Sequence, residues 1–154
     1  MDKVTVRAST PEDAVQVALN IRESDRDEIW ASGKKLPIPC LLSAYNRSSM
    51  CQSIVVDGDV VCILGVAPVS FLDSVGSPWL IATDNVYKYP VSFLRICQKA
   101  VLAMQSSYST LINYVDDRNK ISMTWLSHLG FHVFEDAEPY GPFNMPFHRF
   151  ELRK

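Results

Sequence analysis

The amino-acid sequence predicts an α/β (α+β) domain in which helices flank a mixed, mostly antiparallel β-sheet. Two observations predict it: strand-like runs recur between segments of helical periodicity, and a strong hairpin signal stands in the first half. The expected order is β-α-α-β-β-β-α-β-α-β-β, with about six to seven strands and about four helices. The 154 residues are expected to form one domain. Residues 1–115 would be its N-terminal half, and residues 116–154 its last helix and closing strands.

A strand and a helix are expected first. Residues 4–7 alternate apolar and polar side chains, as in a half-buried strand. Thr10 then offers an acceptor for a backbone N–H at a helix start, and Pro11 fits the first turn. The acids Glu12 and Asp13 complement the helix dipole. A second, strongly charged helical stretch follows.

Proline-containing segments mark two expected breaks. Residues 34–40 contain two prolines and are expected to be a connection, after which residues 40–46 form one or two further helical turns. The segment 73–78 is expected to break the chain again. A short apolar strand over residues 79–83 then suits the centre of the sheet.

A hairpin is expected between these breaks. Residues 50–56 and 60–66 are rich in β-branched side chains and flank Asp57-Gly58-Asp59. Asp-Gly between two such runs is among the stronger short-range hairpin signals, because both residues accept the positive φ of a tight turn.

The second half alternates helices and strands. Apolar side chains at helical spacing predict a helix over residues 90–106, and residues 110–115 form the next expected strand. Residues 132–135 and 147–152 are expected to be closing strands. The segment between them, residues 136–146, is rich in proline, glycine and aromatic residues and is expected to be an ordered loop.

Composition narrows the function classes. The net charge is −2, and no basic run is longer than Lys34-Lys35, which argues against a nucleic-acid-binding protein. The longest nearly apolar run, residues 60–71, is too short to span a bilayer. We expect a cytosolic protein. If it comes from a phage, we expect it in the host cytoplasm or in the virion. The four cysteines have no metal-ligand spacing, so we expect structural thiols and no metal site.

The stretch "NYVDDRNKISMTWLSHLGF", residues 113–131, resembles the strand, Asn-containing turn and helix ending in Leu-Gly-Phe of GNAT-superfamily acetyltransferases. Gly65 followed by the strand over residues 79–83 is similar to the approach to the strand that carries acetyl-CoA in that family. The resemblance covers about residues 1–135 and implies that this strand and the strand over 110–115 splay apart. It also implies that acetyl-CoA or CoA threads its pantetheine arm through the gap.

The resemblance implies two sets of site residues. The expected acid–base groups are Asp84, Tyr114 and His148. The expected cofactor contacts are Ala82, Thr83, Lys88, Asn119 and Ser122.

Each of these polar residues also has a structural interpretation. Asp84 stands at a strand end, where sites are built, but it is equally suited to capping the following turn. Tyr114 is either a displaced acid or a cross-strand aromatic, and His148 is either a base or a half-buried strand histidine. Asn119 is well placed to cap a helix over residues 120–129, which Gly130 would end with a positive φ.

Two departures from the family pattern bear on catalysis. The segment "DNVYKYPVSFLRI", residues 84–96, has none of the glycines that form the family's pyrophosphate cradle, and Pro90 removes one N–H. Leu126 stands where the family commonly has a tyrosine that protonates the departing thiolate. The missing glycine cradle makes CoA binding doubtful, and Leu126 cannot act as the general acid.

A narrower resemblance points to small GNAT-like phage proteins related to internal virion protein A of short-tailed phages. It rests on Trp79, Asp84, Asn113-Tyr114-Val115, Asn119, Trp125-Leu126 and the C-terminal "EPYGPFNMPFHRFEL". It implies a virion assembly component that contacts other phage proteins or itself. The alternative is a divergent acyl-CoA-dependent N-acetyltransferase acting on an unknown amine.

An acidic cluster bears on this choice. Glu23, Asp25, Asp27 and Glu28 form either a receptor for a basic acceptor, such as a polyamine or lysine side chain, or a solvated helix face. The solvated face is the expectation.

Overall fold

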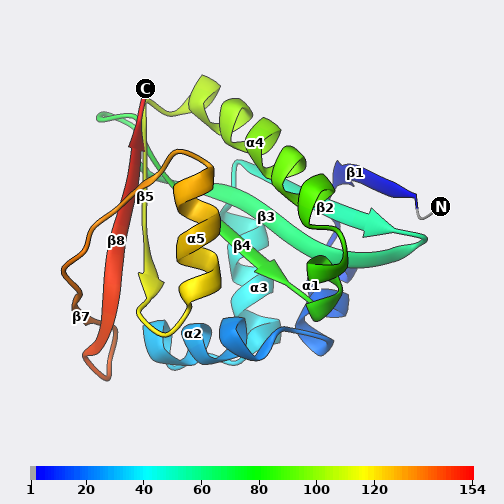
Figure 1. Cartoon of the computed structure of the whole chain (residues 1–154), viewed down its shortest axis with the longest axis horizontal. Helices are drawn as coiled ribbons and strands as arrows, with labels where there is room; N and C mark the ends of the chain where they lie inside the picture. The colour runs from blue at the N-terminus through cyan, green and yellow to red at the C-terminus, as the bar shows by residue number, and fades with distance from the viewer. Residues whose placement is uncertain (1–2) are drawn as a thin grey trace.

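The computed structural model describes residues 3–154 and has, in that range, one eight-stranded sheet, five α-helices and one 3-10 helix (Figure 1). The strands are β1 (Val4–Ala8), β2 (Met50–Val56), β3 (Asp59–Ser70), β4 (Val75–Ala82), β5 (Thr110–Asp116), β6 (His132–Val133), β7 (Glu138–Tyr140) and β8 (Met145–Arg153). The helices are α1 (Pro11–Leu19), α2 (Glu23–Gly33), α3 (Pro37–Arg47), the 3-10 helix η1 (Asp84–Lys88), α4 (Pro90–Ser107) and α5 (Lys120–His128).

The strand order is β1-β2-β3-β4-β5-β8-β6, with β7 also paired to β8. Every neighbouring pair is antiparallel except β4 and β5, which run parallel. The predicted mixed, mostly antiparallel sheet flanked by helices is therefore confirmed, with one more strand and one more helix than the upper expectation.

Helices cover both faces of the sheet, α4 and α5 on one and α1, α2 and α3 on the other (Figure 1). Side chains of a strand alternate between faces, and β3 shows this directly. Cys62, Leu64 and Val66 pack under α4 and α5, while Ile63 packs against α1 and α3. Two cores result, and the central strands are apolar on both sides.

The expected local signals act as predicted at three places. Thr10 caps α1 in a reciprocal arrangement with Asp13. Asp57 and Gly58 both have positive φ, 49° and 88°, and join β2 to β3 in a tight hairpin. Asn119 caps α5 by accepting the Ser122 N–H, and Gly130 follows the helix with φ 95°.

Three segments differ from expectation. Residues 37–39, expected as part of a connection, begin α3, because proline at the first turn of a helix loses no intrahelical hydrogen bond. Residues 75–78, expected as a break, belong to β4. Pro78 is tolerated in this strand because β5 makes no ladder hydrogen bond to it there. Residues 138–140, expected as loop, form β7 against β8.

No helix among residues 3–154 is long and apolar enough to cross a membrane. The four cysteines are free thiols, with Cys62 and Cys97 buried in the core. Burial raises the pKa of Cys97 to about 12. These thiols therefore have the chemistry of small apolar side chains.

Candidate functional site

A gap opens in the sheet between β4 and β5. The two strands pair at Val75 with Thr110 and at Gly76 with Leu111, and then diverge toward their carboxyl ends. Next to the last pair, the Asn113 Nδ2 atom donates to the Pro78 carbonyl at 2.7 Å and bridges the two strands. Carboxyl ends of neighbouring parallel strands are where open sheets build ligand sites.

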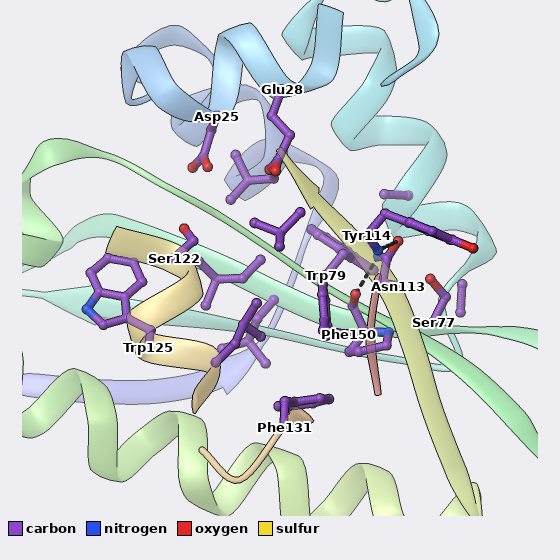
Figure 2. A pocket seen from close by; sticks show the side chains of 18 of the residues that line it. Asp25, Glu28, Ser77, Trp79, Asn113, Tyr114, Ser122, Trp125, Phe131 and Phe150 are labelled. Carbon is purple, nitrogen blue, oxygen red and sulfur yellow. Dashed lines mark hydrogen bonds between the residues drawn. The ribbon is translucent and has the colours of Figure 1, made fainter. Parts of the chain in front are cut away.

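A cavity of about 490 Å³ occupies this gap and reaches both faces of the sheet (Figure 2). Such a volume is within the usual range for small-molecule sites. The β4, β5 and α4 walls are mainly apolar. The polar lining of the cavity includes Asp25 and Glu28 of α2, Tyr114 of β5 and Ser122 of α5.

Glu28 is the ionisable group whose chemistry stands out. Its side chain descends from α2 toward the end of β5 (Figure 2), where Oε1 accepts the Asp116 N–H at 2.6 Å. Burial is the main cause that raises the pKa of Glu28 to about 8; the hydrogen bond from the Asp116 N–H and the charge of Arg22 lower it, while the nearby carboxylates of Asp25 and Asp116 raise it. A carboxyl with a pKa near 8 can take up a proton at neutral to mildly basic pH.

Arg22 and Asp25 form a fully buried ion pair beside the cavity. The guanidinium donates to the Asp25 carboxylate through Nε at 2.9 Å and Nη2 at 2.6 Å. The Arg22 Cζ atom also lies 5.0 Å from the centre of the ring of Trp125, a residue of α5. The pair thereby joins α2 to α5 across the gap.

The chain segment before α2 occupies part of the free edge of β4. Ala82 turns its backbone toward the gap, where its N–H donates to Asp25 Oδ2 at 2.9 Å and its carbonyl accepts the Arg22 N–H at 2.9 Å. Ile21 bridges to Thr83 in the antiparallel sense. Backbone groups alternate along a strand, so Leu80 also faces the gap, between the bridged Pro78 and the covered Ala82.

Aromatic rings line the cavity near Glu28. Tyr114 stacks on Tyr140 with ring centres 4.5 Å apart, and Tyr140 contacts Phe147 at 4.8 Å. Burial raises the pKa of Tyr140, and the neighbouring Tyr114 and Glu28 raise it further. A carboxylate and two aromatic faces therefore meet at one end of the cavity.

The three predicted acid–base residues do not meet in the structure. Tyr114 lines the cavity, whereas Asp84 is exposed on η1. His148 is 8% exposed on β8, where its Nε2 lies 2.6 Å from Asp117 Oδ1 and its Nδ1 lies 2.7 Å from the Phe134 carbonyl. Those two contacts satisfy both ring nitrogens outside the cavity. Catalytic roles for Asp84 and His148 remain predictions with no geometric support.

The predicted cofactor contacts are similarly divided. Ser122 lines the cavity, whereas Ala82 does not, and the Ala82 backbone is already paired with Asp25 and Arg22. Thr83 is buried with its hydroxyl on the Val61 carbonyl, and Lys88 is exposed on η1. Asn119 is buried; its Nδ2 has no hydrogen-bond partner.

The acidic cluster on α2 corrects the expectation of a solvated face. Glu23 and Asp27 are exposed, but Asp25 is 1% exposed and Glu28 is partly buried at the cavity. The spacing of three between Asp25 and Glu28 places both on one helix face, which sequence could have shown. It could not show that this face meets the gap, since α2 has no clear apolar stripe to fix its orientation. Tyr140 was missed because β7 was expected to be loop.

Among the residues described, no group of three His, Cys, Asp or Glu side chains is arranged to hold a metal ion.

The architecture is that of solved GNAT acetyltransferases. A ribosomal-protein-alanine N-acetyltransferase from Brucella melitensis is similar, with a TM-score of 0.74 at 13% identity, over 97% of this chain and 99% of that one. The putative acetyltransferase yncA from Salmonella typhimurium, solved with acetyl-CoA, gives 0.73 at 11% identity, over 98% and 94%. An N-acetyltransferase from Staphylococcus aureus Mu50 gives 0.71 at 14%, over 98% of each chain.

This chain therefore has the GNAT acetyltransferase fold. No family model matches its sequence, and no curated protein matches it either.

Proposed function

We propose that this protein is an N-acyltransferase that transfers an acyl group from a thioester of the acetyl-CoA type to an amine. The observation that carries the proposal is the position of Glu28, a carboxyl with a pKa of about 8 in the wall of a cavity that passes between the splayed strands. The GNAT fold of the structural neighbours, one of them solved with acetyl-CoA, supports the same reaction class.

The cavity offers a path for the thioester arm. Its walls are apolar, and the β4 backbone at Leu80 faces the gap with an amide N–H and a carbonyl available to a ligand amide. Bound there, the thioester supplies an acyl carbon that is open to attack by nitrogen. The residues of the chain position the reactants and exclude water.

The acceptor amine is assigned to the end of the cavity near α2. Glu28 and the stacked rings of Tyr114 and Tyr140 suit a cationic amine, which carboxylates and aromatic faces both attract. A cationic amine first loses one proton to solvent, because only the neutral amine has a lone pair that can attack. As the N–C bond forms and the C–S bond breaks, ionised Glu28 accepts a second proton from the nitrogen. The thioester sulfur leaves as a thiolate and is protonated by solvent, since Leu126 has no proton to give. A thiol with a pKa of about 8.5 can leave as its thiolate without the help of an acid.

The test is turnover with acetyl-CoA and a panel of primary amines, including lysine, spermidine and an alanine-initiated peptide. Acylated amine is followed by mass spectrometry, because the chain's own thiols would disturb a thiol assay. Glu28→Gln is expected to lower kcat by about 10² to 10⁴, while Asp27→Asn, an exposed acid one residue away, serves as the matched control. Equal rates for wild type and Glu28→Gln would refute the assignment.

A second candidate is the phage-type assembly component that works through protein contacts without turnover. An open groove beside the N-terminal helices favours it, because five exposed apolar side chains gather there, namely Leu19, Trp30, Leu36, Ile38 and Phe143. This candidate predicts self-association by light scattering, or capture of a virion protein, in a protein with no acyl transfer. A monomer that turns over acetyl-CoA would exclude it.

A further inference from the structure

The segment that follows β4 is where the fold would meet a nucleotide diphosphate. In open sheets, phosphates bind at the N-terminus of the helix that follows a strand, where unpaired N–H groups point at the ligand. Here that segment is residues 83–93, comprising the end of β4, η1 and the first turn of α4. Its backbone donors decide whether a diphosphate is held.

Most of these donors are already used. The Thr83 N–H bonds to the Val61 carbonyl, the Val86 N–H to Thr83, and the Tyr89 N–H to Val86. Pro90, the first residue of α4, has no N–H. Later N–H groups of a 3-10 helix bond back within the helix, so η1 offers no continuous row of amides. The N–H groups of this segment for which the structure shows no hydrogen bond form two separate pairs, on Asp84 and Asn85 at the start of η1 and on Val91 and Ser92 in the first turn of α4.

The side chains do not replace the missing amides. Asp84 is exposed at the start of η1 and sets a negative charge beside an incoming diphosphate. Lys88 and Arg95 are the nearby cations in the sequence, but both are exposed, and single exposed charges contribute little binding energy. No glycine stands between Gly76 and Gly130, so backbone cannot approach a phosphate as closely as a glycine loop allows.

The protein therefore offers more binding groups to the thioester arm than to the nucleotide. The arm has a cavity of about 490 Å³ and the open β4 edge at Leu80. The nucleotide has a surface with few free donors and an adverse charge. We propose that the donor site recognises the pantetheine thioester arm and makes no use of the adenine nucleotide, so that pantetheine thioesters are donors whatever the arm is attached to. The inference rests on the proposed acyl transfer.

The experiment compares S-acetylpantetheine with acetyl-CoA as donor, with one acceptor amine that is turned over. The expected result is kcat/KM values within about threefold of each other, and no inhibition by about 5 mM 3′,5′-ADP, the nucleotide part alone, since that concentration would detect even millimolar binding. Calorimetry gives a readout independent of turnover: pantetheine and CoA should bind with similar Kd, and 3′,5′-ADP should give no heat.

A preference of about 100-fold or more for acetyl-CoA, roughly 2.7 kcal/mol, together with inhibition by 3′,5′-ADP, would overturn the inference. It would leave the proposed function intact, because acyl transfer would still be observed. Absence of transfer from either donor, with Glu28→Gln equal to wild type, would instead refute the proposed function and the inference built on it.

Discussion

The Asp25 carboxylate on α2 accepts the backbone N–H of Ala82 at 2.9 Å, so a helix side chain covers the last gap-facing N–H of β4. Glu28 does the same for Asp116 at the end of β5. Two acids one helical turn apart thus terminate the two strands that splay. The distance between those strand ends is set by one rigid helix, which makes α2 part of the site.

The Arg22–Asp25 pair is expected to be the most sensitive polar contact in the fold. Asp25→Asn leaves a fully buried guanidinium without its counter-charge, and breaking one partner of a buried pair costs about 3–5 kcal/mol. A loss of Tm on the order of 10 °C follows for a chain of this size. Thermal unfolding measures it, with the exposed neighbour substitution Glu23→Gln as control. A shift as small as the control's would show that the pair contributes no net stability.

Glu28 is expected to set the pH dependence of both rate and stability. Its folded pKa of about 8 lies above the ordinary value, so the stability it contributes is complete below about pH 4.5 and is lost as the pH rises toward 8. Glu28→Gln should therefore become more stable than wild type as the pH rises through this window. Denaturant unfolding between pH 5 and 9 checks the sign, with Asp27→Asn as control.

The rate has the opposite dependence on the same group. A general base is active when ionised, so kcat/KM should rise with pH until about 8, and this limb should disappear in Glu28→Gln. An acceptor of low pKa, such as an aromatic amine, keeps the titration of the substrate out of the profile. If the limb persists in the variant, the base is another group.

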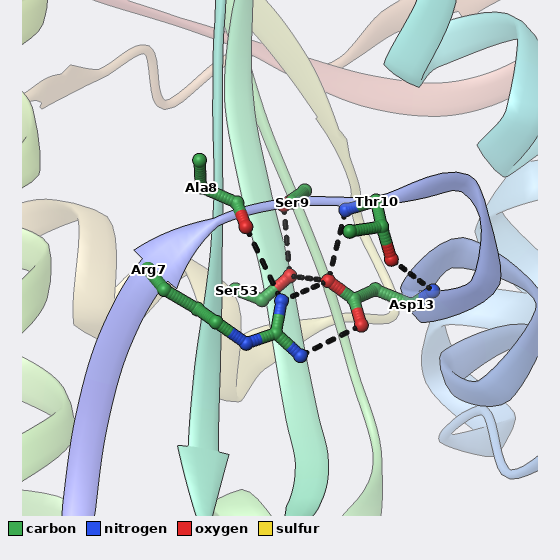
Figure 3. A network of polar contacts seen from close by, with 6 residues as sticks. All are labelled: Arg7, Ala8, Ser9, Thr10, Asp13 and Ser53. Carbon is green, nitrogen blue, oxygen red and sulfur yellow. Dashed lines mark hydrogen bonds and ion pairs between the residues drawn. The ribbon is translucent and has the colours of Figure 1, made fainter.

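Asp13 is expected to control acid stability at the other end of the sheet (Figure 3). Burial raises the pKa of its carboxyl, but hydrogen bonds from Arg7, the Thr10 N–H and Ser53 outweigh burial and lower it to about 2. The stabilisation is present above about pH 4 and is lost as the pH falls toward 2.

Asp13→Asn should cost about 1–2 kcal/mol near pH 6, because the helix cap weakens along with the ion pair. The deficit should shrink toward pH 2. The neighbouring Glu12→Gln is the control, since Glu12 is exposed. A deficit that is independent of pH would assign the effect to packing.

His148 is expected to stabilise the fold in its protonated form. The hydrogen bond to Asp117 raises its pKa, burial lowers it, and the Phe134 carbonyl adds to the rise. Its contribution is therefore complete below about pH 6.5 and lost as the pH rises through the raised value. His148→Gln should destabilise more at pH 5.5 than at pH 8.5, with exposed His128→Gln as control. A pKa at or below 6.5 from NMR titration of His148 would contradict this.

How much of this the sequence predicted depends on how local the cause is. The cap at Thr10, the Asp57-Gly58 hairpin, the Asn119 cap and the positive φ of Gly130 each depend on a few neighbouring residues, and all are confirmed. The prolines of α3 misled because the same residue both ends and begins helices. Strand β7 has only three residues and exists because β8 is there to pair with it.

The sequence by itself determined the mixed sheet, the helices that flank it, and the segments that border the gap, because periodicity and turn chemistry are written along the chain. It also located the loss of glycines after β4. Only the tertiary structure decided which polar residues meet. Asp84, Tyr114 and His148 are compatible with one site until the strands are placed, and then only Tyr114 lines the cavity. Glu28 acquires its raised pKa mainly from burial, at a place where it meets Asp116, 88 positions away in the sequence. Burial and charge at a site are sums over neighbours in space, and those neighbours are fixed only when the helices pack on the sheet.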